Sequence, residues 1–484
     1  MVQARGRRSA DRENDGTLNV VRVVVFALLL LVPIAAMAEP TPAPMSTVQP
    51  VPGEEMPGMP GMQHPAPFPH PVRLFAPMTR DGSGTSWMPD ASEMYGTMRE
   101  RDGVVSMDHY ALFPRYVTTG SKRGDRALSA PGWFMASQST VLDAHSEIRT
   151  RAMLSLDELT IHGRGFPELL QTGETNRGLH LHDHQHPHNV LGEISVGYDR
   201  QLGRQRTFSL YVADPGEPAL GPPAFMHRRI GWDMPDPPIS HHWSDSTHIT
   251  FGVLTAGLGS SALKLEASTF TGREPNEIRT NFNPVHLDSY SARLSWNPSR
   301  FLAAQASFAA IKEPESTHPG NNRHNTSLSV LFERPTQNGD VYVAAIAGRN
   351  ADTQYPTENA YLLEAVRRVG SQTFYARAER VQKDEDDLGL GRALTIVPGT
   401  GFDGRVPQHL QPGFARADAV VDLVGAYTLG FVHDLRRSSG SMQTGIGGQL
   451  TLDAIPPRLR GVYGKSIEYG GQLFLRLRPP LHRH

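Results

Sequence analysis

From residue 105 onward, apolar and polar side chains alternate along runs of eight to twelve residues, and this pattern constrains the fold more than any other feature. In the clearest run, residues 289–296, Tyr290, Leu294 and Trp296 share one face, while Arg293 and three serines share the other. Successive side chains of a β-strand point to opposite faces, so the run predicts a strand with one apolar and one polar face. The same pattern recurs at 302–311, 327–333, 446–453 and 472–478.

Two architectures produce such strands: a soluble β-sandwich or propeller, and a membrane barrel that turns its apolar faces to lipid. The barrel is favoured because Arg, Lys, Glu and Gln stand in mid-strand and because no apolar stretch after residue 40 reaches the roughly 20 residues of a spanning helix. We therefore predict a transmembrane antiparallel β-barrel over residues 105–484, with about 16 strands and a range of 12–18. Many such barrels end on an aromatic residue, whereas this sequence carries a PPLHRH tail after the last run.

The first 38 residues have the order of a secretory signal peptide. Four arginines precede or open the apolar run Val23–Ala36, which Pro33 interrupts, and Ala36-Met37-Ala38 forms a small-x-small cleavage site. A single membrane anchor is the alternative, but the run is short for a span. The absence of cysteine excludes a lipoprotein anchor and thiolate chemistry. We predict cleavage near Glu39 and export to the Gram-negative outer membrane, with outer-membrane lipid and the barrel insertion machinery as partners.

Residues 39–104 form a Pro/Met-rich leader that is predicted to be disordered in the periplasm. Nine of the sixteen methionines fall between Met45 and Met107. Thioether sulfur is a soft metal ligand and imidazole suits borderline metals. Weak metal capture is therefore predicted at Met56, Met59, Met62 and His64.

Histidine is concentrated in the middle of the chain, with nine of twenty-one between His180 and His248. The string LHLHDHQHPH would place alternate histidines on one side of an extended segment, although Pro187 argues against a regular central strand there. Imidazole and carboxylate ligands suit copper, which is favoured here, or zinc as the alternative. Adventitious surface histidines and a hydrogen-bonded network inside the barrel remain the competing interpretations. The predicted metal ligands are His182, His184, His186, His188, His227, His241, His242, Asp245 and His248.

Charged residues beside these clusters predict an ion-pair network that holds loops against the lumen wall. A constriction selecting small ions or solutes is the sharper alternative, because rings of charge set pore selectivity. The residues concerned are Asp183, Glu217, Arg228, Arg273, Glu274 and Glu277.

Several function classes are disfavoured. A net charge of −2, from 47 basic and 49 acidic residues, gives no footprint for nucleic acid, and the sequence has no glycine loop of the kind that binds nucleotides after a strand. Ser240, Ser244 and Ser246 stand among histidines, so a barrel hydrolase stays open as an alternative. No G-x-S-x-G motif is present, so we assign no catalytic residue and expect no enzyme activity.

The string GETNRGLHLHDHQHPHNVLGEISVGYD, with DPGEPALGPPAFMHR, HHWSDSTHI, TGREPNE and GTSWMPD, resembles an uncharacterised family of bacterial outer-membrane β-barrel proteins. The resemblance spans residues 84–300 and implies an outer-membrane barrel without an assigned activity. The leader string MPGMPGMQH is similar to the Met/His-rich leaders of outer-membrane copper-resistance proteins. The matching positions are Asp183, Gln185, His186, Pro187, His188, Glu217, Pro218, His227, Arg228, His242, Asp245, Ser246, His248, Arg273, Glu274 and Glu277.

Together these features predict an outer-membrane channel or binding protein in metal homeostasis or resistance, with copper as the favoured metal and a His/Asp site in or near the lumen. The alternative is a passive porin or structural barrel whose polar lumen residues only pair with one another.

Overall fold

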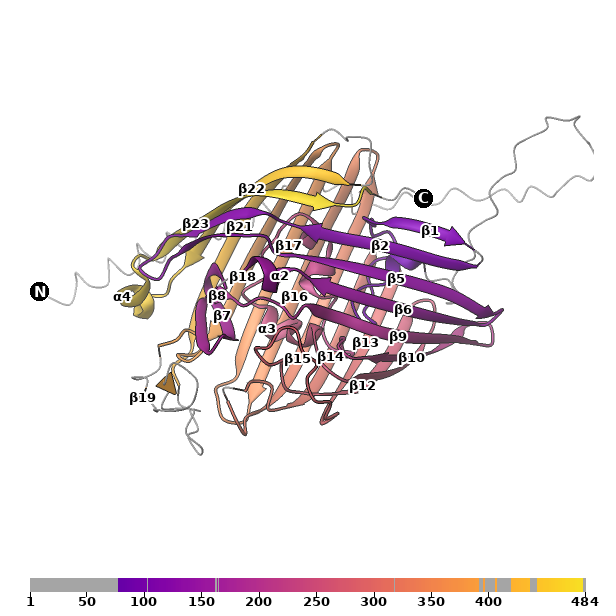
Figure 1. Cartoon of the computed structure of the whole chain (residues 1–484), viewed down its shortest axis with the longest axis horizontal. Helices are drawn as coiled ribbons and strands as arrows, with labels where there is room; N and C mark the ends of the chain where they lie inside the picture. The colour runs from indigo at the N-terminus through magenta and orange to yellow at the C-terminus, as the bar shows by residue number, and fades with distance from the viewer. Residues whose placement is uncertain are drawn as a thin grey trace, which may run out of the picture.

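The computed structural model describes residues 77–481, except 102, 162, 164, 317, 391–394, 397–404, 407–418 and 436–441. The chain forms a closed antiparallel barrel of sixteen strands, which confirms the predicted fold and strand count (Figure 1). The predicted signal peptide and the residues Met56, Met59, Met62 and His64 lie outside the described part of the chain. In the described residues, no helix combines the length and the apolar character that a membrane crossing requires.

Each strand of the wall pairs with the next along the chain, and two wall strands are broken into two pieces, β2 with β3 and β4 with β5. The barrel closes where β23 pairs with β3, in register from Gly470↔Thr119 to Phe474↔Arg115. The wall consists of β2 (Val104–Leu112), β3 (Arg115–Thr119), β4 (Arg126–Ser129), β5 (Gly132–Asp143), β6 (Ser146–Ser155), β9 (Leu191–Leu202), β10 (Arg206–Ala213), β11 (Val253–Gly259), β12 (Leu263–Phe270), β13 (Ser289–Ser299), β14 (Leu302–Lys312), β15 (Asn322–Thr336), β16 (Gly339–Asp352), β17 (Glu358–Val369), β18 (Gln372–Lys383), β21 (Asp422–Asp434), β22 (Gln443–Ala454) and β23 (Ile467–Arg478).

The apolar side chains of the alternating runs face outward, as predicted, and the polar side chains face the lumen. On β13, Tyr290, Leu294 and Trp296 are 61%, 46% and 49% exposed on the outer face, whereas Arg293 and Ser295 are buried toward the lumen. The outer face is therefore apolar and the inner face polar, as in a barrel that faces lipid.

The two ends of the barrel differ in the length of their connections. At one end the strands are joined by short turns, such as 203–205, 260–262 and 337–338. The other end carries the long connections, which contain α2 (Asp157–Thr160), the hairpin β7 (Phe166–Asn176) and β8 (Leu179–Gln185), β19 (Thr395–Ile396), β20 (Arg405–Val406), η7 (Pro457–Leu459) and α4 (Arg460–Tyr463). We call these the short-turn end and the long-loop end.

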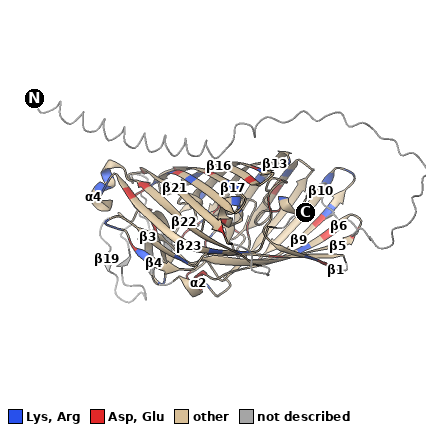
Figure 2. Cartoon of the chain, turned by 90° about the horizontal axis from the view of Figure 1, so that it is seen from above, with Lys and Arg blue, Asp and Glu red and all other residues tan. Residues whose placement is uncertain are grey.

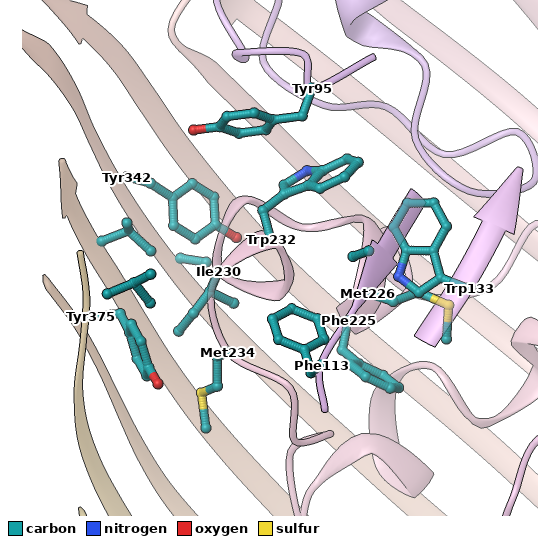
Figure 3. Close-up of a cluster of buried hydrophobic side chains, with 14 of the residues drawn as sticks. Tyr95, Phe113, Trp133, Phe225, Met226, Ile230, Trp232, Met234, Tyr342 and Tyr375 are labelled. Atoms are coloured by element: carbon teal, nitrogen blue, oxygen red, sulfur yellow. The ribbon is translucent and has the colours of Figure 1, made fainter. Parts of the chain in front are cut away.

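The lumen is filled rather than open. The connection between β10 and β11, residues 214–252, folds inward and carries η3 (Phe225–His227), η4 (Arg229–Trp232), α3 (His241–Ser244) and η5 (Ser246–His248). Nearly all of its residues are buried. We call it the plug segment. Its apolar side chains pack with inward residues of the wall into one aromatic and methionine-rich core (Figure 3).

Residues 77–101, which the sequence placed in the disordered leader, have a defined structure. They include η2 (Met78–Arg80) and β1 (Thr97–Arg101), which pairs with β2. The Arg80 guanidinium binds both carboxylate oxygens of Asp90 at 2.6 Å and the carbonyl of Ser261 in a short turn. Tyr95 packs at 5.3 Å from the Trp232 ring of the plug segment. This part of the leader therefore covers the lumen at the short-turn end.

The outward apolar face generates a first prediction. Leu294 lies in the middle of β13, so the substitution Leu294→Arg should lower the free energy of unfolding by about 2–4 kcal/mol in a bilayer. Leu258→Arg, near the end of β11, is the matched control and should cost about 0–1 kcal/mol. Urea unfolding in lipid vesicles measures both values. Equal costs for the two variants would contradict a lipid-facing band centred on Leu294.

Candidate functional site

Buried ion pairs hold the plug segment to the barrel wall. Arg228 binds Glu364 of β17 through Nε and Nη2, each at 2.9 Å, and Asp245 of the plug through Nη1 at 3.0 Å. All three side chains are at most 1% exposed. Paired, hydrogen-bonded charges of this kind fix one geometry, because each buried charge left without its partner is costly.

Arg229, the residue after Arg228, forms a second set of ion pairs. Arg229 binds Asp340 of β16 at 2.7 Å and Asp233 of the plug at 2.6 Å. Asp233 also pairs with Arg476 of β23. Figure 2 shows that positive and negative positions are interspersed over the strands rather than separated into two fields. Arg228, which the sequence placed in a lumen network, pairs with Asp245 and Glu364 inside the barrel.

The structure brings five of the predicted metal ligands together. We call them the histidine cluster: His186, His188, His241, His242 and His248. Ring centroids are 6.0 Å apart for His186 and His188, 5.4 Å for His188 and His248, 6.1 Å for His241 and His248, and 4.1 Å for His241 and His242. The first two histidines follow β8, which ends at Gln185, just before Pro187. The other three lie on α3 and η5 of the plug segment.

Hydrogen bonds fix one nitrogen of two rings and leave the other available. His188 Nδ1 lies 2.6 Å from Asp157 Oδ2, and His248 Nδ1 lies 2.6 Å from the Asp245 carbonyl oxygen. Within the described part of the chain, His188 Nε2, His248 Nε2 and both ring nitrogens of His241 are buried without a hydrogen-bond partner. The unprotonated nitrogen of a neutral imidazole is the atom that binds metal, and here it is Nε2 of His188 and His248 and one nitrogen of His241.

Burial and neighbouring histidines lower the pKa of two imidazoles in the cluster. Burial first, and the adjacent His188 second, lower the pKa of His248 to about 3. Burial, followed by His242 and His248, holds the pKa of His241 well below its usual range. Both rings are therefore neutral at pH 7, which is the protonation state that a metal ligand requires.

The remaining predicted histidines lie outside the cluster. His227 packs 5.0 Å from the Trp133 ring and 6.2 Å from His109. His184 Nε2 is 3.3 Å from Asp125 Oδ2, and His182 Nδ1 is 3.4 Å from the carbonyl oxygen of Asp387. Asp245 lies at the edge of the cluster, because its Oδ2 accepts from Arg228 and its Oδ1 lies 3.9 Å from His241 Nδ1. The three histidines do not join the cluster as a single site.

The other residues of the predicted lumen network are dispersed over the long-loop end. Asp183 pairs with Arg123 at 2.6 Å, Glu277 accepts from the Gly178 N–H at 2.6 Å, and Arg273 pairs with Glu313 on the surface. Glu274 lies 3.8 Å from His242 Nδ1. Burial raises the pKa of Glu217 to about 8. Both carboxylate oxygens of Glu217 are buried without a hydrogen-bond partner in the described residues. The remaining contacts are separate from one another, so these residues do not form one ring.

Ser240 does not contact a histidine through its hydroxyl, which donates to Glu379 Oε2 at 2.6 Å.

One cluster was not predicted from the sequence. Carboxylate oxygens of Glu358, Asp384 and Asp387 lie within 4.8 Å of one another at the long-loop end, and they are the only His/Asp/Glu trio in the described residues to do so. The acidic run Lys383–Asp387 was the only sign of this carboxylate cluster in the sequence. Glu358, the third carboxylate, begins a different strand, so no local pattern connects it with that run.

Comparisons with known proteins agree on little beyond the fold. No protein-family model and no curated protein matches the chain in sequence. Among solved structures, the chain is similar to Salmonella typhi OmpF in complex with daunomycin, at 9% identity and a TM-score of 0.48, covering 79% of this chain and 100% of that one. It is also similar to an anion-selective porin from Comamonas acidovorans (9%, 0.44, 77% and 99%) and to Pseudomonas putida OprB (9%, 0.43, 77% and 94%). At such similarity no argument about function rests on these proteins.

The first prediction from the site concerns the buried ion pairs. Arg228→Ala leaves Asp245 and Glu364 buried without their cation, so it should lower the free energy of unfolding by about 3–5 kcal/mol and loosen the plug. Arg273→Ala, which removes a half-exposed ion pair, is the control and should cost about 0–1 kcal/mol. The thermal midpoint of heat-modifiable gel migration measures stability, and the single-channel current in a planar bilayer measures opening. An Arg228 variant that matches the control in both assays would refute this role.

The second prediction concerns pH. The pKa of His248 is lowered from 6.5 to about 3 on folding, so the unfolded chain binds the proton more tightly. The stabilisation is fully present above about pH 6.5 and is lost as the pH falls toward 3. The difference in Tm between wild type and His248→Gln should therefore narrow when metal-free protein is taken from pH 7.5 to 4. A difference that stays constant with pH would contradict a buried neutral His248.

Proposed function

We propose that this protein is an outer-membrane barrel that binds a transition-metal ion, copper in the first place and zinc as the alternative, at the histidine cluster inside its filled lumen. The outer-membrane location is supported by the apolar outer face and polar inner face of the strands. The metal proposal rests on one observation: buried, neutral imidazoles from two distant segments meet with ring nitrogens that have no described hydrogen-bond partner.

The chemistry of the cluster fits such an ion. His188, His241 and His248 would supply nitrogen ligands, with His186 and His242 adjacent. Asp157 accepts from His188 Nδ1, which orients the ring in the way that a carboxylate orients metal-bound histidines. No three of these residues have ligand atoms within 4.8 Å of one another in the described part of the chain. Binding therefore requires rotation of His188, His241 and His248, all of which contact the Phe225 ring.

A passive barrel is the second candidate, and the ion pairs of Arg228 and Arg229 favour it. These ion pairs bind the plug to the wall through protein groups alone. In that case small solutes would pass only through gaps beside the plug segment, and the histidines would serve as packing. Metal affinity separates the two candidates.

The test is a calorimetric titration of purified, metal-stripped full-length protein with Cu(II) and with Zn(II). Wild type should bind one ion tightly at the cluster, and the variant His188→Ala/His248→Ala should lose affinity by about ten-fold or more. His145→Ala, in an exposed turn at the short-turn end, is the matched control and should leave the affinity unchanged. Equal affinity in the double variant and the control would leave the passive barrel as the function.

A further inference from the structure

A cavity lies on the side of the lumen covered by the leader, away from the histidine cluster. Its volume is about 90 Å³, and it is lined by residues 77–96, by η3 and η4 of the plug and by inward residues of the wall strands. Its lining is unusual in carrying five thioethers, from Met78, Met88, Met94, Met107 and Met135, together with the imidazoles of His109 and His227.

Strand register brings the wall ligands together. His109 of β2 stands directly opposite Met135 of β5, and Met107, two residues before His109, lies on the same side of β2. The chain crosses this point at Gly96, where a Cβ atom would stand 3.1 Å from Met107 Cγ and 3.3 Å from its sulfur. A side chain at position 96 would collide with the Met107 thioether, so the glycine makes room for the Met107 sulfur.

His109 is the residue that points to a ligand. Its side chain is more than nine-tenths buried, and its Nε2 has no hydrogen-bond partner within the described part of the chain. Its ring lies 5.3 Å from Trp133 and 6.0 Å from Trp232. A buried imidazole nitrogen without a protein partner, set among aromatic rings and thioethers, would gain a partner from a bound cation.

The charges in this cavity are already engaged with one another. Arg149 binds Asp199 at 2.9 Å, Arg151 binds Glu193 at 2.9 Å, and Arg229 binds Asp340 at 2.7 Å. Three acidic residues, Asp81, Glu93 and Glu333, also line the cavity. Two of them are paired with arginines, because Arg149 Nη1 lies 3.2 Å from Asp81 and Arg368 binds Glu93. These pairs occupy the carboxylates that a hard divalent cation would need as ligands. A soft monovalent ion held by sulfur and nitrogen carries less charge and needs none.

We propose that this cavity, which we call the thioether pocket, is a binding site for a soft monovalent cation, Cu(I) or Ag(I), held by methionine sulfurs and His109. The site is separate from the histidine cluster in position and in ligand chemistry. Loss of metal binding at the histidine cluster would therefore leave the proposal for the thioether pocket intact.

The test uses full-length protein labelled with ¹³C at the methionine methyl groups and titrated with Ag(I), which mimics Cu(I) without redox chemistry. The methyl resonances of Met94, Met107 and Met135, assigned by single Met→Leu substitutions, should shift together at one equivalent. Leucine keeps the apolar volume while removing the sulfur. Met107→Leu/Met135→Leu should weaken Ag(I) binding by about ten-fold or more. Met234→Leu, a buried methionine elsewhere in the same core, is the matched control.

The outcomes are distinct. Shifts confined to leader methionines such as Met56, Met59 and Met62, or no shifts at all, would overturn the proposal. An affinity unchanged in Met107→Leu/Met135→Leu would also overturn it, and heat-modifiable migration checks that this variant folds. His188→Ala/His248→Ala should leave the methyl shifts intact, so loss of the histidine cluster and loss of the thioether pocket are told apart.

Discussion

The buried contacts of Arg228 and Arg229 are the constraint on which the rest of the lumen depends. A polar lumen gives the wall an inward face that carries charges, and a loop folded into it must match those charges or leave them unpaired. Glu364 and Asp340 come from adjacent wall strands, and the two arginines are neighbours in the plug, so one short stretch satisfies both. Held in this way, the plug separates the histidine cluster on one side from the thioether pocket on the other.

The wall could be predicted from the sequence because its signal is local. Alternation along residues 289–296 reports directly which side chains face out, and the structure shows that pattern on β13. Repetition of the pattern indicated about the right number of strands. The end of β8 at Gln185, before Pro187, follows from the same local rule, because proline removes a ladder hydrogen bond.

The lumen could be predicted only in part. The composition of residues 182–248 indicated that histidines would meet, and five of them do, but His227 points to a different cavity because η3 turns it toward Trp133. The partners of Arg228 lie 136 residues away in Glu364 and 17 residues away in Asp245, and no periodicity connects them. The leader was judged by its proline content, yet Tyr95 and Arg80 pack against the barrel because the barrel supplies the Trp232 ring and the Ser261 carbonyl as partners.

The pairing of Asp233 with Arg476 links the plug to β23, the strand that closes the wall against β3. The plug segment precedes most of the wall in the chain, whereas its last charge partner comes from the final strand. The filling of the barrel and its closure are thus coupled through one carboxylate. A barrel that lacks its terminal strand has an open seam, and Asp233 inside it has lost two of its three arginines, Arg476 and Arg478. An incompletely assembled wall therefore also has an incompletely seated interior.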